Sequence, residues 1–145
     1  MLFMEQKLLS RSADETEYYG SALAQGLQPG SVIALFGGLG AGKTAFVRGL
    51  ARGLGVTGEI CSPTYALVHE HPGNPALIHF DMYRIEGPDG LESTGWFDYL
   101  GRGCVIAVEW SENIIGELPE NAMRVRITPG EGENERYIMI EGAGQ

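Results

Sequence analysis

Residues 37–44 read Gly37-Gly38-Leu39-Gly40-Ala41-Gly42-Lys43-Thr44 and fit the pattern G-x-x-x-x-G-K-[ST]. A loop that wraps a phosphate must aim several backbone N–H groups inward, and glycine removes the side chains that would obstruct this approach. In this pattern the lysine contacts the β- and γ-phosphates of a nucleoside triphosphate, and the threonine hydroxyl binds Mg²⁺. We call this segment the glycine-rich loop and take it, with the following Ala45, as the candidate cofactor-binding segment.

The flanks of the glycine-rich loop predict a strand before it and a helix after it. Ser31-Val32-Ile33-Ala34-Leu35-Phe36 is an apolar run rich in β-formers, as expected of a buried parallel strand. Apolar residues then recur at i, i+3 and i+4 spacings, and Gly55 follows as a stop; these residues are Phe46, Val47, Leu50, Ala51 and Leu54. This order places a helix N-terminus under the phosphates. A glycine-rich turn that matched the pattern by chance would not be expected to have both a buried strand before it and an amphipathic helix after it.

The composition indicates one globular domain over residues 1–145. Hydrophobic residues make up 43% of the 145 residues and charged residues 20%, and no apolar run approaches the roughly 20 residues of a membrane span. The apolar Met1–Met4 meets Glu5 at once and is too short for a signal peptide. We therefore expect a cytoplasmic protein without a membrane partner.

The charge and the cysteines argue against two further classes of function. The net charge is -9 with only 10 lysines and arginines, whereas binding to a phosphate backbone needs clustered cations. Direct nucleic-acid binding is therefore not expected, and a basic partner protein suits the chain better. Cys61 and Cys104 lie far apart without a CxxC partner, so neither a disulfide framework nor a zinc site is indicated.

Two acidic residues follow apolar segments that read as strands. Asp81 follows Leu77-Ile78-His79-Phe80, and Glu109 follows the long apolar run Cys104-Val105-Ile106-Ala107-Val108. Ligands of open α/β sheets bind at the carboxyl ends of the strands, so the Glu109 carboxylate is expected beside the Mg²⁺ bound by Thr44. Asp81 is expected to project from the same edge. A solvated or salt-bridged aspartate remains an alternative for Asp81.

The remaining segments predict supporting structure. Ser12-Ala13-Asp14-Glu15 has the form of a capping box and predicts a helix with an apolar stripe of Tyr18, Ala22 and Leu23, to which Tyr19 is a further candidate. Other expected elements are an edge strand over residues 7–11, a strand over 65–71 paired as a hairpin with 77–80, one or two short helices over 91–100 broken at Gly95, and an antiparallel meander over 123–127 and 136–141. His69 and His71 lie at strand spacing and are expected at the surface.

The segment Thr57–Thr64 is irregular and contains Gly58 and Ser62-Pro63. A loop that follows the nucleotide helix often supplies a hydroxyl that senses the γ-phosphate. Thr64 is the candidate for this role, and an ordinary turn is an equally compatible interpretation.

Four blocks of this chain resemble the TsaE (YjeE) family of small bacterial ATPases in tRNA threonylcarbamoyladenosine synthesis. They are the glycine-rich loop followed by Phe46-Val47-Arg48-Gly49, then Ser62-Pro63-Thr64-Tyr65, His79-Phe80-Asp81-Met82-Tyr83-Arg84, and Glu109-Trp110. The chain departs from the family pattern at Gly38, where aspartate is usual, at Ala45, where a second threonine is common, and at Ser111, where proline is usual. None of the three departures removes a group that phosphate or metal binding requires.

The resemblance implies an α/β fold of the P-loop NTPase class, a three-layer sandwich whose mainly parallel sheet has an antiparallel extension. It implies ATP and Mg²⁺ as cofactors, with Lys43 on the phosphates, Thr44 and Glu109 at the metal, Thr64 in a switch-like loop, and Asp81 orienting or activating water. The implied partner is a TsaB–TsaD heterodimer, in which TsaD transfers the threonylcarbamoyl group to the adenosine beside the anticodon. The chain would hydrolyse ATP to reset that complex and would meet tRNA only through it.

Two other functions share the glycine-rich loop. A small-molecule kinase needs a lid with arginines, yet Arg84 and Arg102 are the only cationic residues between Arg52 and Arg124. A nucleotide-sensing binding module would use ATP to order the Thr64 loop, with hydrolysis incidental. The sequence leaves this alternative open, and both it and the ATPase are expected to turn over slowly in isolation. A GTPase is disfavoured because no N-K-x-D motif occurs.

Overall fold

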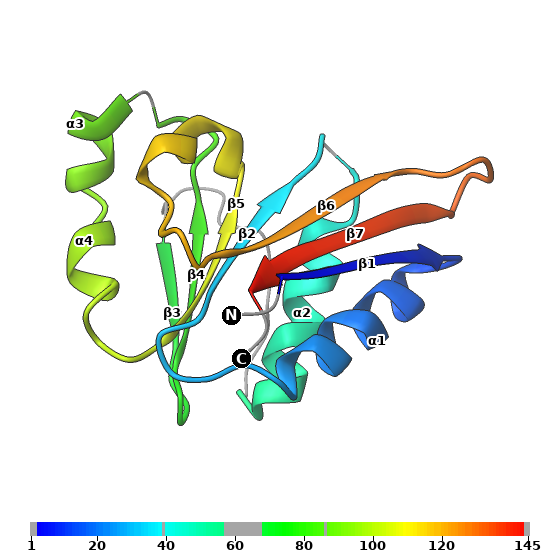
Figure 1. Ribbon diagram of the computed structural model, residues 1–145, viewed down its shortest axis with the longest axis horizontal. Helices are drawn as coiled ribbons and strands as arrows, with labels where there is room; N and C mark the ends of the chain where they lie inside the picture. The colour runs from blue at the N-terminus through cyan, green and yellow to red at the C-terminus, as the bar shows by residue number, and fades with distance from the viewer. Residues whose placement is uncertain (1–2, 39, 57–67, 86, 144–145) are drawn as a thin grey trace.

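The computed structural model describes residues 3–38, 40–56, 68–85 and 87–143 (Figure 1). Its strands are β1 Phe3–Ser10, β2 Val32–Phe36, β3 Val68–His71, β4 Leu77–Asp81, β5 Val105–Glu109, β6 Met123–Pro129 and β7 Arg136–Ala143. Its helices are α1 Ala13–Ala24, α2 Lys43–Leu54, α3 Gly87–Glu92, α4 Trp96–Tyr99 and the 3₁₀ helix η1 Ser111–Glu117. The predicted elements are therefore present wherever the structure describes the chain, but several boundaries differ from the prediction. Strand β1 begins four residues earlier than expected and ends at Ser10, α3 begins at Gly87 where a loop was expected, and β7 continues two residues further.

The described strands form a seven-stranded sheet in the order β1-β7-β6-β2-β5-β4-β3. The four central strands, β6, β2, β5 and β4, are parallel. Antiparallel pairing adds β7 and β1 at one edge and β3 at the other. Every residue of β2 and β5 is buried, as expected of parallel strands covered on both faces. A parallel core with an antiparallel extension is thus confirmed, and the extension occurs on both sides.

Helices cover both faces of this sheet and make three layers. Successive strand residues point to opposite faces: Ile33 and Leu35 pack in the core beneath α1 and α2, whereas Val32 packs in the core beneath α3, α4 and η1. Figure 1 shows α1 and α2 on one side of the strands and α3 and α4 on the other. The three-layer α/β sandwich predicted from the sequence is therefore correct.

Among the helices of residues 3–38, 40–56, 68–85 and 87–143, none combines the length and the hydrophobicity that crossing a bilayer requires.

The N-terminus of α1 confirms the expected cap, but its buried face differs from the prediction. The Ser12 hydroxyl accepts the Glu15 N–H at 3.0 Å, as a capping box requires. Tyr18, however, is 65% exposed, and Ala22 is also exposed. The helix instead buries Thr16, Gly20 and Ala24. The prediction was therefore wrong for Tyr18 and Ala22, whereas Tyr19 and Leu23 are partly buried and pack against the core as expected. The apolar pattern missed Thr16 and Gly20 because neither is a large apolar residue.

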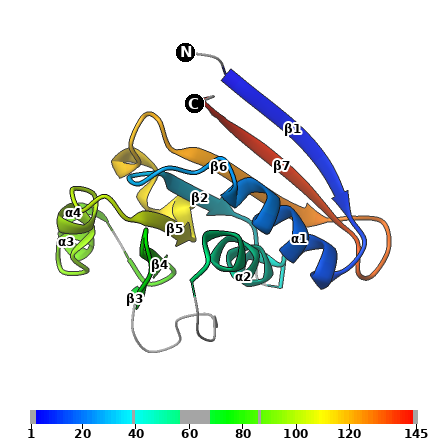
Figure 2. The same cartoon turned by 90° about the horizontal axis from the view of Figure 1, so that it is seen from below.

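Helices α1 and α2 touch through their backbones. A Cβ added to Gly20 would lie 2.3 Å from the Phe46 carbonyl oxygen, and one added to Gly49 would lie 2.0 Å from the Glu17 carbonyl oxygen. Figure 2 shows the two helices side by side beneath the strands. Because α2 begins at the glycine-rich loop, this close packing fixes the loop against the rest of the fold.

Substitution Gly49→Ala is expected to lower the free energy of unfolding by about 2 kcal/mol or more, because overpacking against a backbone atom forces the helices apart. The gain in helix propensity, up to about 1 kcal/mol, offsets only part of this loss. Urea denaturation measures the change. Gly116→Ala is the matched control, since a Cβ at Gly116 meets nothing within 4 Å. Equal midpoints for the two variants would contradict the close approach of α1 and α2.

Candidate active site

The glycine-rich loop joins the end of β2 to the start of α2. Gly37, Gly40 and Gly42 have positive φ angles of 148°, 73° and 102°, a region that L side chains rarely adopt. Gly42 caps α2 with no side-chain hydrogen bond, so the first N–H groups of the helix are not bonded to a capping side chain. A helix N-terminus of this kind is suited to an anion. Leu39 lies outside the described residues.

Close packing also explains why the first residue of the loop is a glycine. A Cβ at Gly37 would lie 2.5 Å from the Ile127 carbonyl oxygen of β6. Gly38, where the TsaE pattern usually has aspartate, faces open space. The loop therefore passes directly over β6 at Gly37 and projects outward at Gly38.

Lys43 carries a cationic group into this loop, and no ion pair within 4 Å holds it in the described structure. The residue is only 5% exposed, and its Nζ donates to the Gly37 carbonyl at 2.7 Å and lies 3.9 Å from the centre of the Trp110 ring. Burial lowers the pKa of Lys43, and the charges of Glu109 and Glu112 partly offset that effect. An anion placed against this ammonium would be bound strongly.

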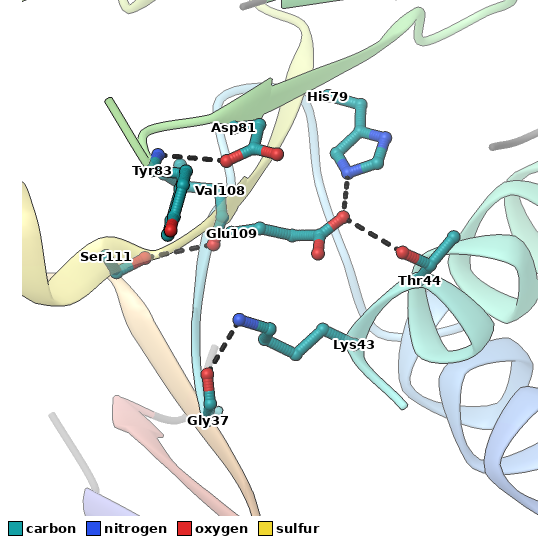
Figure 3. A network of polar contacts seen from close by, with 9 residues as sticks. All are labelled: Gly37, Lys43, Thr44, His79, Asp81, Tyr83, Val108, Glu109 and Ser111. Atoms are coloured by element: carbon teal, nitrogen blue, oxygen red, sulfur yellow. Dashed lines mark hydrogen bonds and ion pairs between the residues drawn. The ribbon is translucent and has the colours of Figure 1, made fainter. Parts of the chain in front are cut away.

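The two predicted carboxylates are neighbours at the carboxyl edge of the sheet. Asp81 ends β4, Glu109 ends β5, and the two are partners in the parallel register. Glu109 is 3% exposed, and its Oε2 accepts hydrogen bonds from Thr44 Oγ1 at 3.3 Å and from His79 Nε2 at 2.6 Å (Figure 3). Thr44 and Glu109 thus bring two oxygen donors together, the type of ligand that Mg²⁺ prefers.

The environment of Asp81 makes its carboxylate more basic than usual. Burial raises the pKa of Asp81, and the nearby Glu109 adds to this effect. The Tyr83 N–H, which Asp81 Oδ1 accepts at 2.9 Å, lowers the pKa again, as do the charges of His79 and Lys43. The net direction is upward, which suits a group that accepts a proton.

One cavity of about 720 Å³ gathers most of these groups, and its size is in the range of small-molecule and cofactor sites. Its lining comprises the loop residues Gly40, Ala41, Gly42, Lys43, Thr44 and Ala45, the strand-end residues Asp81, Tyr83, Glu109 and Trp110, and Ser12, Ala13, Thr16, Arg48, Asn134 and Arg136. Residues 40–45 of the candidate cofactor-binding segment, Asp81 and Glu109 therefore lie around one cavity, as expected from the sequence, whereas Gly37 and Gly38 do not line it. Thr64, the remaining candidate, lies outside the described residues.

Two contacts of the glycine-rich loop and one backbone conformation beside it were not anticipated from the sequence. Arg136, at the start of β7, donates to the Gly40 carbonyl at 3.2 Å. Glu112, in η1, accepts the Gly37 N–H at 3.3 Å. Trp110 adopts a left-handed conformation with φ of 58°, and such strain in a residue with a side chain is concentrated at functional sites. Each contact joins residues distant in sequence, and none carries a local motif that would have revealed it.

A sequence model described as "Threonylcarbamoyl adenosine biosynthesis protein TsaE" matches residues 10–138. The chain belongs to the TsaE family. It is 38% identical over 121 residues to a tRNA threonylcarbamoyladenosine biosynthesis protein TsaE from Treponema pallidum, covering 83% of this chain and 90% of that protein. The corresponding Streptomyces coelicolor protein is 39% identical over 133 residues, with 87% and 89% covered.

A solved structure supports the same assignment. The crystal structure of YdiB from Bacillus subtilis superposes with a TM-score of 0.81 at 31% sequence identity, and the match covers 99% of this chain and 89% of that one. The fold expected from the resemblance is thereby confirmed, and the family places the chain in tRNA threonylcarbamoyladenosine biosynthesis.

The departures from the TsaE pattern are accommodated locally. Ser111, where proline is usual, is buried and donates its hydroxyl to the Val108 carbonyl at 2.9 Å (Figure 3). Ala45, where threonine is common, is buried in the first turn of α2. Neither substitution removes a polar atom from the cluster of Lys43, Thr44 and Glu109.

Proposed function

We propose that this chain is a Mg²⁺-dependent ATPase that supports tRNA threonylcarbamoylation by acting on a TsaB–TsaD heterodimer. One observation carries the ATPase proposal: the buried Lys43 ammonium and the carboxylates of Asp81 and Glu109 line the same cavity. Phosphoryl transfer needs a cation at the transferred group and an acid at the metal. This arrangement supplies both.

The residues present fit ATP and Mg²⁺. The open, positive-φ positions at Gly40 and Gly42 let the backbone approach phosphates. Thr44 and Glu109 would hold the metal, with oxygens already 3.3 Å apart. When bound, Mg²⁺ neutralises charge on the β- and γ-phosphates. Lys43 would exchange its bond to the Gly37 carbonyl for a phosphate oxygen, and such a charged pair is the stronger hydrogen bond.

Asp81 is the group proposed to handle the attacking water. Its carboxylate lies at the end of β4, beside Glu109 in the register, and its raised pKa favours acceptance of a proton. Tyr83 N–H holds one oxygen at 2.9 Å, which leaves the other oxygen to orient or activate the water. ATP hydrolysis would then proceed by displacement at the γ-phosphate.

The cavity's own arginines favour slow turnover in isolation. Arg136 donates to the carbonyls of Gly40, Glu133 and Glu135, and Arg48 pairs with Glu17 at 3.6 Å. Both guanidiniums are thus engaged by groups of this chain, and neither is directed at the glycine-rich loop as a free cation in the described structure. An arginine supplied by a partner raises such rates by ~10³–10⁵, which supports a partner-stimulated enzyme.

The proposed contact with tRNA is indirect. A net charge of -9 repels a phosphate backbone, so the chain is expected to meet tRNA only through the TsaB–TsaD complex.

The test is ATP hydrolysis by the purified protein, alone and with a TsaB–TsaD pair, using Lys43→Ala as the blank. Stimulation by the pair that is absent in the blank supports the proposal. Nucleotide binding without stimulation would contradict it and favour a nucleotide-sensing module. Phosphorylation of a small hydroxyl-bearing acceptor by the isolated chain would instead identify a kinase.

A further inference from the structure

His79 occupies a buried position behind the proposed metal site. It lies in β4, two residues before Asp81, with 0% of its surface exposed. Alternate strand residues share a face, so His79 and Asp81 both face α2, as Glu109 does on the adjacent β5. The His79 Nε2 atom lies 2.6 Å from Glu109 Oε2 (Figure 3). Because His79 is fully buried, it cannot contact solvent or a bound ligand directly. Its role must lie in its contacts with other residues of this chain.

The direction of this hydrogen bond follows from the chemistry of the pair. An ionised carboxylate only accepts hydrogen bonds, so the proton of the bond belongs to His79 Nε2. A donor at this distance from a charged acceptor forms a strong, charge-assisted bond. Among the described residues, Nδ1 of His79 has no partner. Within the described residues, the polar contact of the His79 side chain is therefore its hydrogen bond to Glu109.

That bond orients the Glu109 carboxylate. Oε2 receives both His79 and Thr44 as donors, and Figure 3 shows the second carboxylate oxygen on the side of Lys43. Without His79, the glutamate side chain would have one buried donor fewer to select its conformation. The free oxygen would then no longer be held toward the cavity that Thr44 and Glu109 line.

We infer that His79 is a positioning residue that holds Glu109 ready for Mg²⁺. This inference rests on the proposed function, since it assigns His79 to the same metal site. Residues that hydrogen-bond to metal ligands orient them, and their loss typically costs 10–100-fold in metal affinity or activity. His79 itself touches neither nucleotide nor metal in this role.

The experiment compares His79→Leu, His79→Gln and His69→Leu with the wild type. Leucine is apolar and removes the donor, whereas the glutamine amide restores a donor close to the position of Nε2. His69 is the matched control, because it is the cross-strand partner of His79 in β3 but is half-buried and makes no contact with Glu109 in the described structure. Binding of a non-hydrolysable ATP analogue is measured calorimetrically with Mg²⁺ and with EDTA, and hydrolysis is measured against Mg²⁺ concentration.

For His79→Leu we expect the Mg²⁺ concentration at half-maximal hydrolysis to rise by about 10–100-fold. Its affinity for the analogue in EDTA should stay near that of the wild type. His79→Gln should recover much of the loss, and His69→Leu should match the wild type. The inference would be overturned, with the proposed function left intact, if His79→Leu kept the wild-type dependence on Mg²⁺. The same holds if it lost as much affinity for the analogue in EDTA as in Mg²⁺. A wild type whose analogue binding ignores Mg²⁺ would instead overturn the proposed metal site.

Discussion

Replacing Lys43 with methionine is expected to lower partner-stimulated ATP hydrolysis by at least ~10²–10³-fold, the cost of removing one preorganised group that stabilises transition-state charge. Methionine keeps an unbranched side chain of similar length, so the buried position remains filled. Nucleotide affinity should also fall, because Lys43 has no carboxylate within 4 Å in the described structure and its charge is available to phosphate. Steady-state hydrolysis and calorimetric binding measure both effects.

The chain provides a direct control for this variant. Lys7 is the only other lysine in the sequence, and it is exposed on β1, away from the cavity lining. Lys7→Met removes the same net charge and should leave hydrolysis unchanged. If both variants lost activity equally, the effect would come from net charge and not from the glycine-rich loop.

Replacing Asp81 with asparagine is expected to lower hydrolysis by ~10²–10⁴-fold, the usual contribution of a positioned general base. Nucleotide affinity should be retained, because the asparagine carbonyl oxygen can still accept the Tyr83 N–H that Asp81 accepts at 2.9 Å. A variant with normal stimulated hydrolysis would show that Asp81 neither orients nor activates the water. Asp98→Asn, at an exposed position in α4, is the matched control.

The same variant carries a prediction about stability and pH. The pKa of Asp81 is raised in the folded protein, so the protonated form is favoured by folding. Its stabilising contribution is complete below the unfolded pKa and is lost as the pH rises through the folded pKa. Asp81→Asn should therefore raise the melting temperature relative to the wild type at pH 7, and by less near pH 4. Melting curves across this interval, with Asp98→Asn alongside, measure the difference.

The residues around the cavity are not arranged to maximise the free energy of unfolding. Lys43 and Asp81 both lie where burial opposes their charged forms, and Trp110 adopts a left-handed backbone. Unfavourable groups of this kind are retained where function requires them. The close packing of α1 and α2 at Gly20 and Gly49 holds the helix that begins at the glycine-rich loop against its neighbour.

Much of the architecture was predictable because its signals are local. The glycine-rich loop depends on consecutive residues, and the flanking strand and helix follow from side-chain periods of 2 and 3.6 residues. Gly55 ends α2 in a left-handed cap, as its position indicated. Asp81 and Glu109 were identified as strand-end acids, and the carboxyl ends of neighbouring parallel strands meet at one edge of a sheet.

Local patterns in the sequence therefore predict the type of loop, the order of strands and helices, and the two carboxylates at the strand ends. The contacts between distant residues became visible in the packed fold: His79 with Glu109, Arg136 with Gly40, and Gly49 with the backbone of α1. Such contacts depend on strand order, register and the distance between helices, which no local spacing encodes. A glycine against a neighbouring helix and a histidine behind a carboxylate are recognised only when the elements are packed together.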